Sequence, residues 1–185
     1  MTHKEMSEIF AVMLLAYPNA EVFKGGVAKL GPTINLWVTA LPEVDYWTGC
    51  QAVAKLVREC KYPPTIAEFK TKAEAVHSEV MTQISSAWNR VKTEIGVFGE
   101  SPQEFFAGLP EDSGIRRTIE MIGGPDCIVI KEEHTFGDGH KEMVEEYNYH
   151  KFVEAYEKVL RQTNALSGGP RKAVGPGVKQ IGGKT

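Results

Sequence analysis

The sequence has few cysteines. Cys50, Cys60 and Cys127 are the three in a chain of 185 residues, and they are widely spaced, odd in number and without a C-x-x-C pair. Disulfide frameworks and structural zinc sites use paired, regularly spaced cysteines, so neither is expected here. We therefore expect three free thiols that are buried or half-buried.

Long apolar runs are also missing. No stretch reaches the roughly eighteen apolar residues that a membrane span needs. The opening residues, MTHKEMSEIF, lack the basic and then apolar layout of a secretion signal. Hydrophobic residues make up 42% of the chain and charged residues 24%, which is typical of soluble domains. We expect a cytoplasmic protein without membrane contact.

The signatures of common catalytic sites are absent from the sequence. It contains no G-x-S-x-G, no H-E-x-x-H and no Gly-rich dinucleotide loop. The chain ends in GKT, as a phosphate-binding loop does, but Val178 stands where that loop needs a glycine. We expect no enzyme activity, no cofactor and no ATP site.

A weak metal signal lies in HTFGDGH, where His134, Asp138 and His140 are close together and Glu132 and Glu133 precede them. Imidazole and carboxylate groups can bind a transition metal, which keeps a metal-dependent enzyme as one hypothesis. The spacing fits no established zinc signature, and glycine-containing loops collect polar residues in any case. We favour a solvated loop and predict no metal site.

What the sequence contains is mostly helical periodicity. Apolar residues recur every three or four positions in several stretches, which predicts amphipathic helices. The predicted helices cover about residues 4–17, 32–41, 44–60, 65–95, 102–108, 115–122 and 140–164. Ser101 is the expected N-cap of the fifth, and Gly123 is expected to end the sixth. In the third, the apolar side is formed by Val44, Trp47, Cys50, Ala54 and Val57; residues 127–130, CIVI, are a short strand or a buried turn.

The stretch KYPPTIAEFK predicts a rigid corner between two helices. Pro64 keeps Pro63 out of the helical region, so the chain is extended there. Thr65 and Glu68 have the spacing of a capping box, in which each side chain accepts a hydrogen bond from the other's backbone N–H. Pro63, Pro64, Thr65 and Glu68 therefore form a structural corner that starts the long helix 65–95.

The last 21 residues differ from the rest in charge. Residues 165–185 contain Arg171, Lys172, Lys179 and Lys184 and no acid, so this segment is +4 and residues 1–164 total −7. Six glycines and two prolines predict a disordered tail. It is either an inert linker or purification remnant, or a segment that orders on a partner through residues such as Val174, Val178 and Ile181.

Together these patterns predict an all-α protein. We expect an N-terminal helical domain over residues 1–82, a second helical region over 83–164, joined to the first by the long helix, and a flexible basic tail over 165–185. Trp37, Trp47 and Trp88 lie on apolar stripes and are expected in the core. Arg116 and Arg117 could contact phosphate, but a solvated helix surface is the more common case.

Several segments together resemble the bacteriophage replicative-helicase loader and inhibitor proteins. These are EIFAVMLLAYPNA, AWNRVKTEIGVFG, GLPEDSGIRRTIEMIGG and FVEAYEKVLRQ, together with the long segment that starts at INLW and ends at AEFK. The likeness covers most of residues 5–163. Its most specific part is a Trp, a Leu, an Ala-Val helix and then PPTIAE, which here are Trp37, Leu41, Ala52, Val53, Pro63, Pro64, Thr65, Ile66, Ala67 and Glu68.

The resemblance implies a non-enzymatic adaptor of phage DNA replication. Such proteins bind and restrain the hexameric replicative helicase and help to load it at origin DNA, with the phage origin-binding initiator as a further partner. The family's flexible C-terminal part, implicated in helicase contact, corresponds here to Ala165–Thr185. The alternative is a DNA-binding replication or packaging accessory. Because residues 1–164 are acidic, we expect direct DNA contact to be weak or absent.

Overall fold

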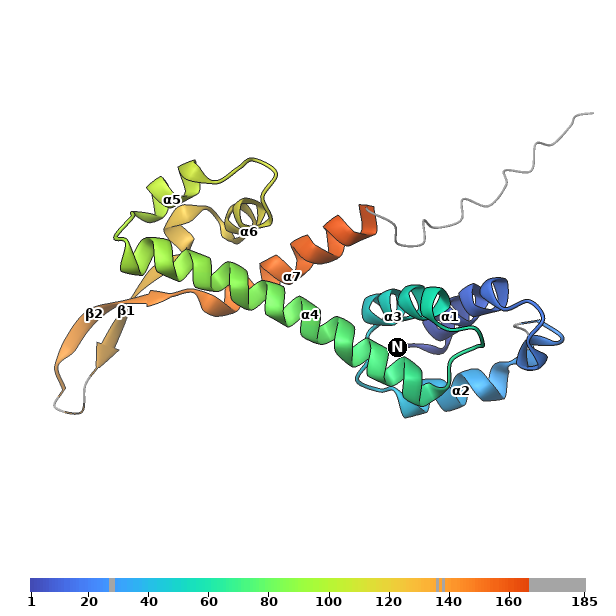
Figure 1. Cartoon of the computed structure of the whole chain (residues 1–185). Coiled ribbons are helices and arrows are strands. Elements are labelled where there is room, and N and C mark those ends of the chain that lie inside the picture. Colours follow the sequence, from blue (N-terminus) through green and yellow to red (C-terminus); the bar gives the residue numbers. More distant parts are fainter. Residues whose placement is uncertain (27–28, 136, 138, 167–185) are drawn as a thin grey trace, which may run out of the picture.

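The structure is a computed structural model and describes residues 1–26, 29–135, 137 and 139–166. It is mostly helical, which confirms the all-α prediction except for one β-hairpin (Figure 1). The predicted tail lies outside the described residues from position 167 onward. The elements are α1 (His3–Ala16), η1 (Glu21–Phe23), α2 (Gly31–Ala40), α3 (Tyr46–Glu59), α4 (Ile66–Lys92), η3 (Thr93–Val97), α5 (Pro102–Gly108), α6 (Gly114–Ile122), η4 (Pro125–Cys127), β1 (Val129–Thr135), β2 (Lys141–Tyr147) and α7 (Tyr149–Leu166).

Helices α1, α2 and α3 pack with the first turns of α4 into what we call the N-terminal lobe. A capping box of Thr2 and Glu5 starts α1. At the centre, the Trp37 ring lies edge-on to Phe10 and to Phe69, with ring centroids 5.1 and 5.3 Å apart. Buried apolar side chains from all four helices surround these rings. The core therefore joins α4 to the three helices before it.

The second half of α4 packs with α5, α6, η4 and α7 into what we call the C-terminal lobe. Its core includes Trp88, Ile119 and Phe152, the last two fully buried. Gly123 ends α6 at φ 114°, a left-handed conformation that glycine adopts without steric cost. The prediction that Gly123 ends this helix is confirmed.

Helix α4 runs without interruption from Ile66 to Lys92 and contributes to both lobes. At 1.5 Å per residue it is about 40 Å long. Phe69 and Ala73 belong to the first core, whereas Ala87, Trp88 and Val91 belong to the second. The division of the chain at residues 82 and 83 stays a prediction, and these two separate cores are the observation that supports it.

The prediction of a last helix from about residue 140 is wrong in its first part. Residues 141–147 form β2, which pairs antiparallel with β1 in the register Val129↔Tyr147, and α7 begins at Tyr149. Asn148 separates the strand from the helix and donates from its side-chain amide to the Cys127 carbonyl at 3.1 Å. Backbone pairing between the strands decides this region, and residue spacing within one strand cannot show it.

The apolar side of α3 also differs from the prediction. The fully buried residues are Gly49, Ala52, Val53 and Leu56 together with Thr48. Cys50 and Val57 are only partly buried against the core. The helix lies so close to α1 that a methyl group at Gly49 would meet Ile9 Cδ1 at 2.9 Å, and this close contact fixes the buried side.

Candidate functional site

The predicted corner between α3 and α4 is present in the structure. Thr65 Oγ1 accepts from the Glu68 N–H at 3.3 Å, and Glu68 Oε2 accepts from the Thr65 N–H at 2.7 Å. Hydrogen bonding from Thr65 lowers the pKa of the Glu68 carboxyl below its ordinary value. Pro63 and Pro64 come directly before this cap, so all four predicted corner residues lie together.

Tyr17 fixes the end of α1 against the same corner. Its hydroxyl donates to the Cys60 carbonyl at 3.0 Å and lies 3.4 Å from the Leu56 carbonyl, both at the C-terminal end of α3. These carbonyls have no further helical turn to bond with, so the phenol satisfies groups that the helix end leaves open. Burial raises the pKa of Tyr17, which keeps its hydroxyl protonated as a donor.

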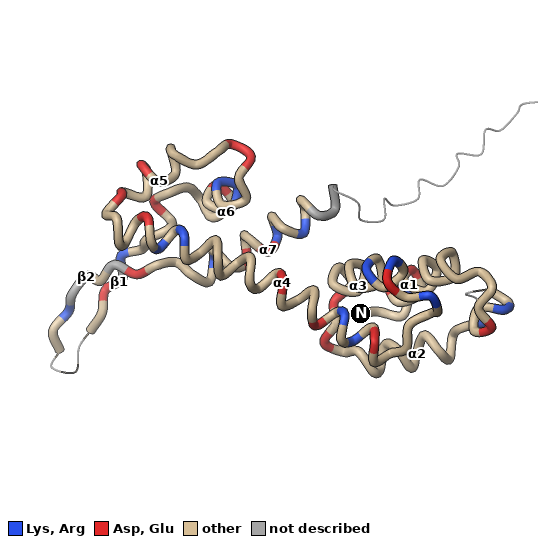
Figure 2. The backbone as a smooth tube through the Cα atoms, viewed as in Figure 1, with Lys and Arg blue, Asp and Glu red and all other residues tan. Residues whose placement is uncertain are grey.

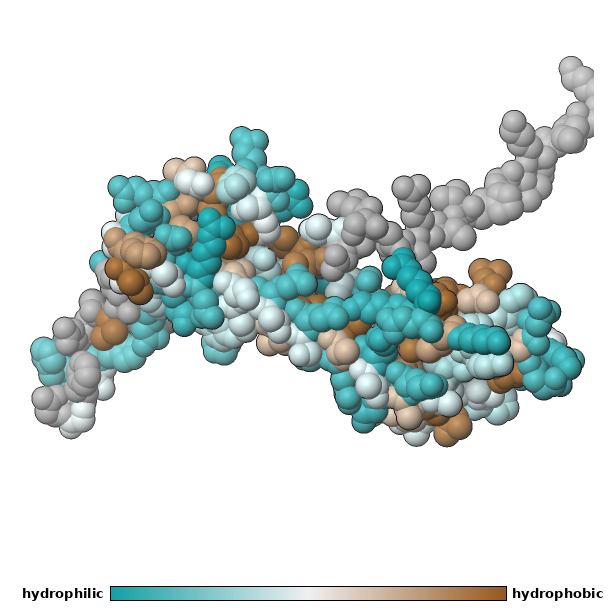
Figure 3. Space-filling model, in the orientation of Figure 1, coloured by the Kyte–Doolittle hydropathy of each residue, from teal (hydrophilic) through white to brown (hydrophobic). Residues whose placement is uncertain are grey.

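An open groove of about 690 Å³ lies beside this corner. We call it the corner groove; it is lined by residues 16–22 and by Lys61, Tyr62 and Pro63. Tyr62 is 70% exposed, and Val22 and the neighbouring Leu15 are exposed as well. The space-filling view shows apolar atoms on this part of the N-terminal lobe (Figure 3). Exposed apolar side chains around a groove indicate a surface that binds another protein segment.

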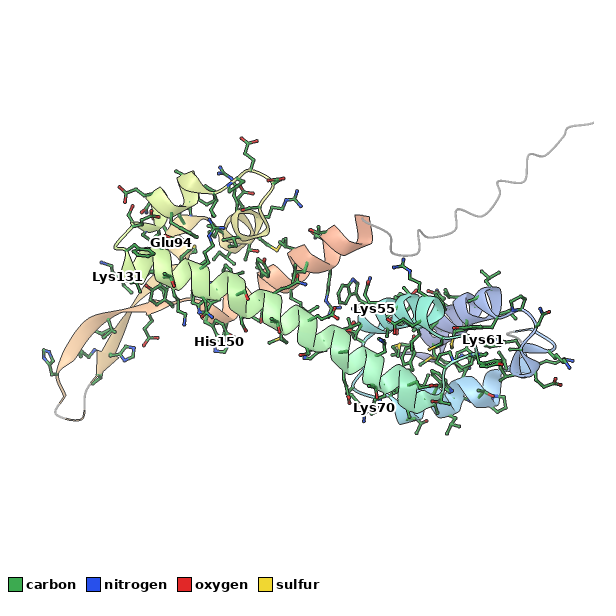
Figure 4. All side chains as sticks on the ribbon, viewed as in Figure 1. Lys55, Lys61, Lys70, Glu94, Lys131 and His150 are labelled. Atoms are coloured by element: carbon green, nitrogen blue, oxygen red, sulfur yellow. The ribbon has the colours of Figure 1, made fainter. Side chains whose placement is uncertain are left out.

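The polar groups at the corner groove are few. Lys61, labelled in Figure 4, places its ammonium 5.6 Å from the Tyr62 ring centroid. Glu21 pairs with Lys24 at 2.6 Å. These groups can orient a peptide, but among the lining residues none forms the nucleophile and base pair that covalent catalysis requires.

The two lobes contact each other through Arg161 of α7. Its guanidinium donates to the Asp45 carboxylate at 2.9 and 3.4 Å and to Glu157 at 2.7 Å. It also lies over the Trp47 ring, 5.1 Å from the centroid. Asp45 has a second function, because it caps α3 by accepting from the N–H groups of Trp47 and Thr48. We call the set of Asp45, Trp47, Glu157 and Arg161 the lobe contact.

The charge of Asp45 is favoured by this arrangement. Partial burial alone raises the pKa of its carboxyl, but hydrogen bonds from Thr48 and Arg161 outweigh the burial and lower the pKa below its ordinary value. The pKa of Arg161 is raised, since its two carboxylate partners outweigh the effect of burial. Both groups therefore stay ionised over the physiological range of pH.

The remaining sequence candidates are not brought together. Arg171, Lys172, Val174, Val178, Lys179, Ile181 and Lys184 lie outside the described residues, as does Asp138. His134 contacts Glu146 at 3.0 Å on the hairpin. In the part of the chain that the structure describes, no three His, Cys, Asp or Glu residues are close enough to bind a metal ion.

Arg116 is engaged within its own lobe. Its guanidinium donates to the Leu109 carbonyl at 3.0 Å, approaches Glu120 at 3.3 Å and lies 4.5 Å from the Phe106 ring centroid. Arg117 is exposed. Basic and acidic positions are interspersed on both lobes (Figure 2), and this pattern does not favour a duplex-binding surface.

Sequence reasoning missed the corner groove and the lobe contact. The YPP triplet could have drawn attention to Tyr62, because an aromatic residue beside a rigid turn is often exposed. No sequence signal links Asp45 to Arg161, which lie 116 positions apart. The three cysteines are free and half-buried, as predicted. None of the helices within residues 1–26, 29–135 and 139–166 combines the length and apolar character needed to span a bilayer.

The fold and the groove define a two-lobed helical protein with an exposed apolar surface on its first lobe. Residues 1–70 match a family model that describes the N-terminal domain of a phage helicase loader and inhibitor protein. This match confirms, for these residues, the resemblance to the phage helicase loader and inhibitor family, and it points to phage proteins that interact with a helicase. No curated protein and no solved structure matches the chain.

Proposed function

We propose that the protein is a phage DNA-replication adaptor that binds and restrains a hexameric replicative helicase and helps to load it at origin DNA. The observation that carries the proposal is the match of residues 1–70 to the N-terminal domain of the loader and inhibitor family. The matched range contains α1, α2, α3, the corner and the first turn of α4. It therefore includes nearly the whole first core and the corner groove.

Residues 165–185 are the segment proposed to contact the helicase. Their charge of +4 and their apolar Val174, Val178 and Ile181 suit a protein surface that is acidic with apolar pockets. Contacts to several subunits of a ring would add through effective concentration, so each contact can be modest. An origin-binding initiator would be the partner that receives the helicase.

Co-elution of the full chain with the purified helicase tests the proposal. We expect the full chain to elute with the hexamer, and a chain without residues 165–185 to fold but bind less helicase. Two further variants separate charge from apolar contact: one replaces the four tail cations by glutamine, and the other replaces Val174, Val178 and Ile181 by serine. Tyr62→Ala at the corner groove serves as the matched surface variant on the first lobe.

The outcomes distinguish the proposal from its rival. Failure of the full chain to bind the hexamer would overturn the helicase proposal, and equal binding by full and truncated chains would overturn the role of the tail. A DNA-binding accessory would instead bind duplex DNA with an affinity that falls steeply with salt. Fluorescence anisotropy with labelled duplex across a salt series measures this directly.

A further inference from the structure

The end of the C-terminal lobe exposes two adjacent large apolar side chains. Val97 is 75% and Phe98 69% exposed. Both follow α4 in the π-helical turn η3, which is closed by the Phe98 N–H donating to the Thr93 carbonyl at 3.0 Å. Neighbouring Ile95 packs against the core, so the wider turn directs the next residues outward. Single π-helical turns are common at functional sites, and adjacent exposed apolar residues indicate a binding surface.

A groove of about 950 Å³ lies beside this turn, between η3, α5 and the base of the hairpin. We call it the hairpin groove. Figure 4 labels Glu94 and Lys131 at this end of the molecule. The groove is lined by Ile95, Glu100, Pro102, Gln103, Asp126, Val129, Ile130, Lys131 and Tyr147.

The position of Tyr147 in this lining is fixed by packing. Its ring lies edge-on to Trp88 with centroids 5.8 Å apart. Its hydroxyl lies so close to the backbone of η3 that a methyl group at Gly96 would meet it at 2.7 Å. Gly96 thus allows the tyrosine to approach the turn, and the groove is preformed on this side.

One wall of the hairpin groove is the edge of a β-strand. Within the described residues β1 pairs with β2 alone, and three successive β1 residues line the groove. Asn148 donates to the Ile128 carbonyl at 2.8 Å. By the alternation of an antiparallel pair, the backbone groups of Val129 then point away from β2. An open strand edge is where an extended segment adds by backbone hydrogen bonding.

The surroundings of the hairpin groove are acidic. Glu100 and Asp126 line it, and Glu94 lies nearby in η3. Neither Glu94 nor Glu100 forms an ion pair with another described residue. The hairpin region 128–147 has six acidic residues and two lysines in the sequence, a net charge of −4 with neutral histidines. An extended occupant with apolar and basic side chains fits this surface.

We propose that the hairpin groove binds this chain's own segment Val178–Ile181, the sequence VKQI, as a short extended strand beside β1. The segment has apolar residues at both ends and a lysine between them, and the 21 residues around it carry +4 without any acid. Val178 and Ile181 contact the apolar lining and Phe98, and Lys179 is attracted by the carboxylates of the groove. The proposal concerns a contact within the chain and does not rest on the helicase contact.

The chain is long enough for this contact. Helix α7 starts two residues after Tyr147 and leads away from the groove over 18 residues, about 27 Å. Residues 167–177 span at most about 36 Å when extended, so they can return along α7 and place Val178 at the groove. If the same segment also contacts a helicase, the groove and the helicase compete for it, and that consequence alone rests on the proposed function.

Amide hydrogen exchange of the full chain, without helicase, tests the proposal. We expect exchange of the β1 amides to be about tenfold faster in Ile181→Asp than in wild type, because the strand edge loses its cover. Phe98→Ala should have the same effect from the groove side. Val174→Asp, which makes the same kind of change outside VKQI, is the matched control and should leave β1 unchanged. Higher salt should also raise β1 exchange in the wild type, since the attraction is partly electrostatic.

The outcomes are separable from a failure of the proposed function. Equal β1 exchange in wild type and Ile181→Asp would overturn the contact, whatever the helicase assay shows. Protection that grows over about a tenfold rise in protein concentration would also overturn it, because the occupant would then come from a second copy. Circular dichroism of each variant confirms that the helices are intact and that faster exchange is not unfolding.

Discussion

Replacing Arg161 by methionine removes the ionic part of the lobe contact while keeping an aliphatic chain against Trp47. The partner change, Asp45→Asn, removes the charge of the carboxylate but keeps a good helix cap for α3, since Asn and Asp are about equally favourable at that position. The two single variants and the double variant form a cycle. The cycle isolates the interaction between the two side chains from their other contacts.

The expected magnitude follows from geometry and exposure. Two hydrogen bonds of 2.9 and 3.4 Å join the side chains, which are 34% exposed for Arg161 and 45% exposed for Asp45. A buried hydrogen bond to a charged group contributes about 1.5–3 kcal/mol, whereas exposed ion pairs contribute at most about 1 kcal/mol. We expect an interaction energy of about 1 kcal/mol. Arg161→Met alone should cost about 1.5–2 kcal/mol, because it also loses Glu157 and the cation–π contact.

Urea unfolding at pH 7, followed by tryptophan fluorescence, measures these free energies. Trp47 belongs to the contact itself, so its signal reports on the loss. Arg117→Met is the matched control, because Arg117 is exposed and has no hydrogen bond to another described side chain. In about 1 M salt the interaction should shrink, since the screening length falls to about 3 Å. An interaction energy below about 0.3 kcal/mol at low salt would refute the reasoning.

Three further outcomes are expected. Thr65→Ala should lower the free energy of unfolding by about 1 kcal/mol through loss of the α4 cap, whereas Thr82→Ala, in the exposed middle of α4, should stay within about 0.5 kcal/mol; urea midpoints compare them. Phe152→Ala should cost about 3–5 kcal/mol, seen as a lower melting temperature by circular dichroism, because its side chain is fully buried; an unchanged melting temperature would contradict the C-terminal core. Because the folded-state pKa of Asp45 is lowered, its carboxylate stabilises the fold above the unfolded pKa of about 4, and this contribution is lost as the pH falls through the folded-state value. The stability advantage of wild type over Asp45→Asn should therefore shrink between pH 7 and pH 3, and an equal advantage at both would contradict the assignment.

Local signals predicted a large part of the fold. The capping box at Thr65, the N-cap at Ser101 and the stop at Gly123 are present in the structure. The four corner residues were identified for the same reason, since each contact joins positions within four residues of each other. Helix α4 was predicted as one unbroken helix because no proline or glycine interrupts it before Gly96.

Contacts between distant segments limited the rest of the prediction. The apolar side predicted for α3 was partly wrong, because close packing of Gly49 against Ile9 decides which residues are buried. Nothing in the spacing of residues 141–147 shows a strand, because its partner lies across the hairpin. Candidate surfaces were missed for a related reason, since sequence periodicity finds residues that enter a core and not apolar residues such as Tyr62 and Phe98 that remain exposed.

The sequence alone therefore determined where helices start and stop, the corner at Pro63 and Pro64, and the family likeness of the first 70 residues, because backbone hydrogen bonds and caps act over one turn of chain. The tertiary structure decided the pairing of β1 with β2, the lobe contact between Asp45 and Arg161, and the two apolar grooves. Each of these depends on surfaces that meet only after the helices have packed, and no property of a single segment encodes which surfaces those are.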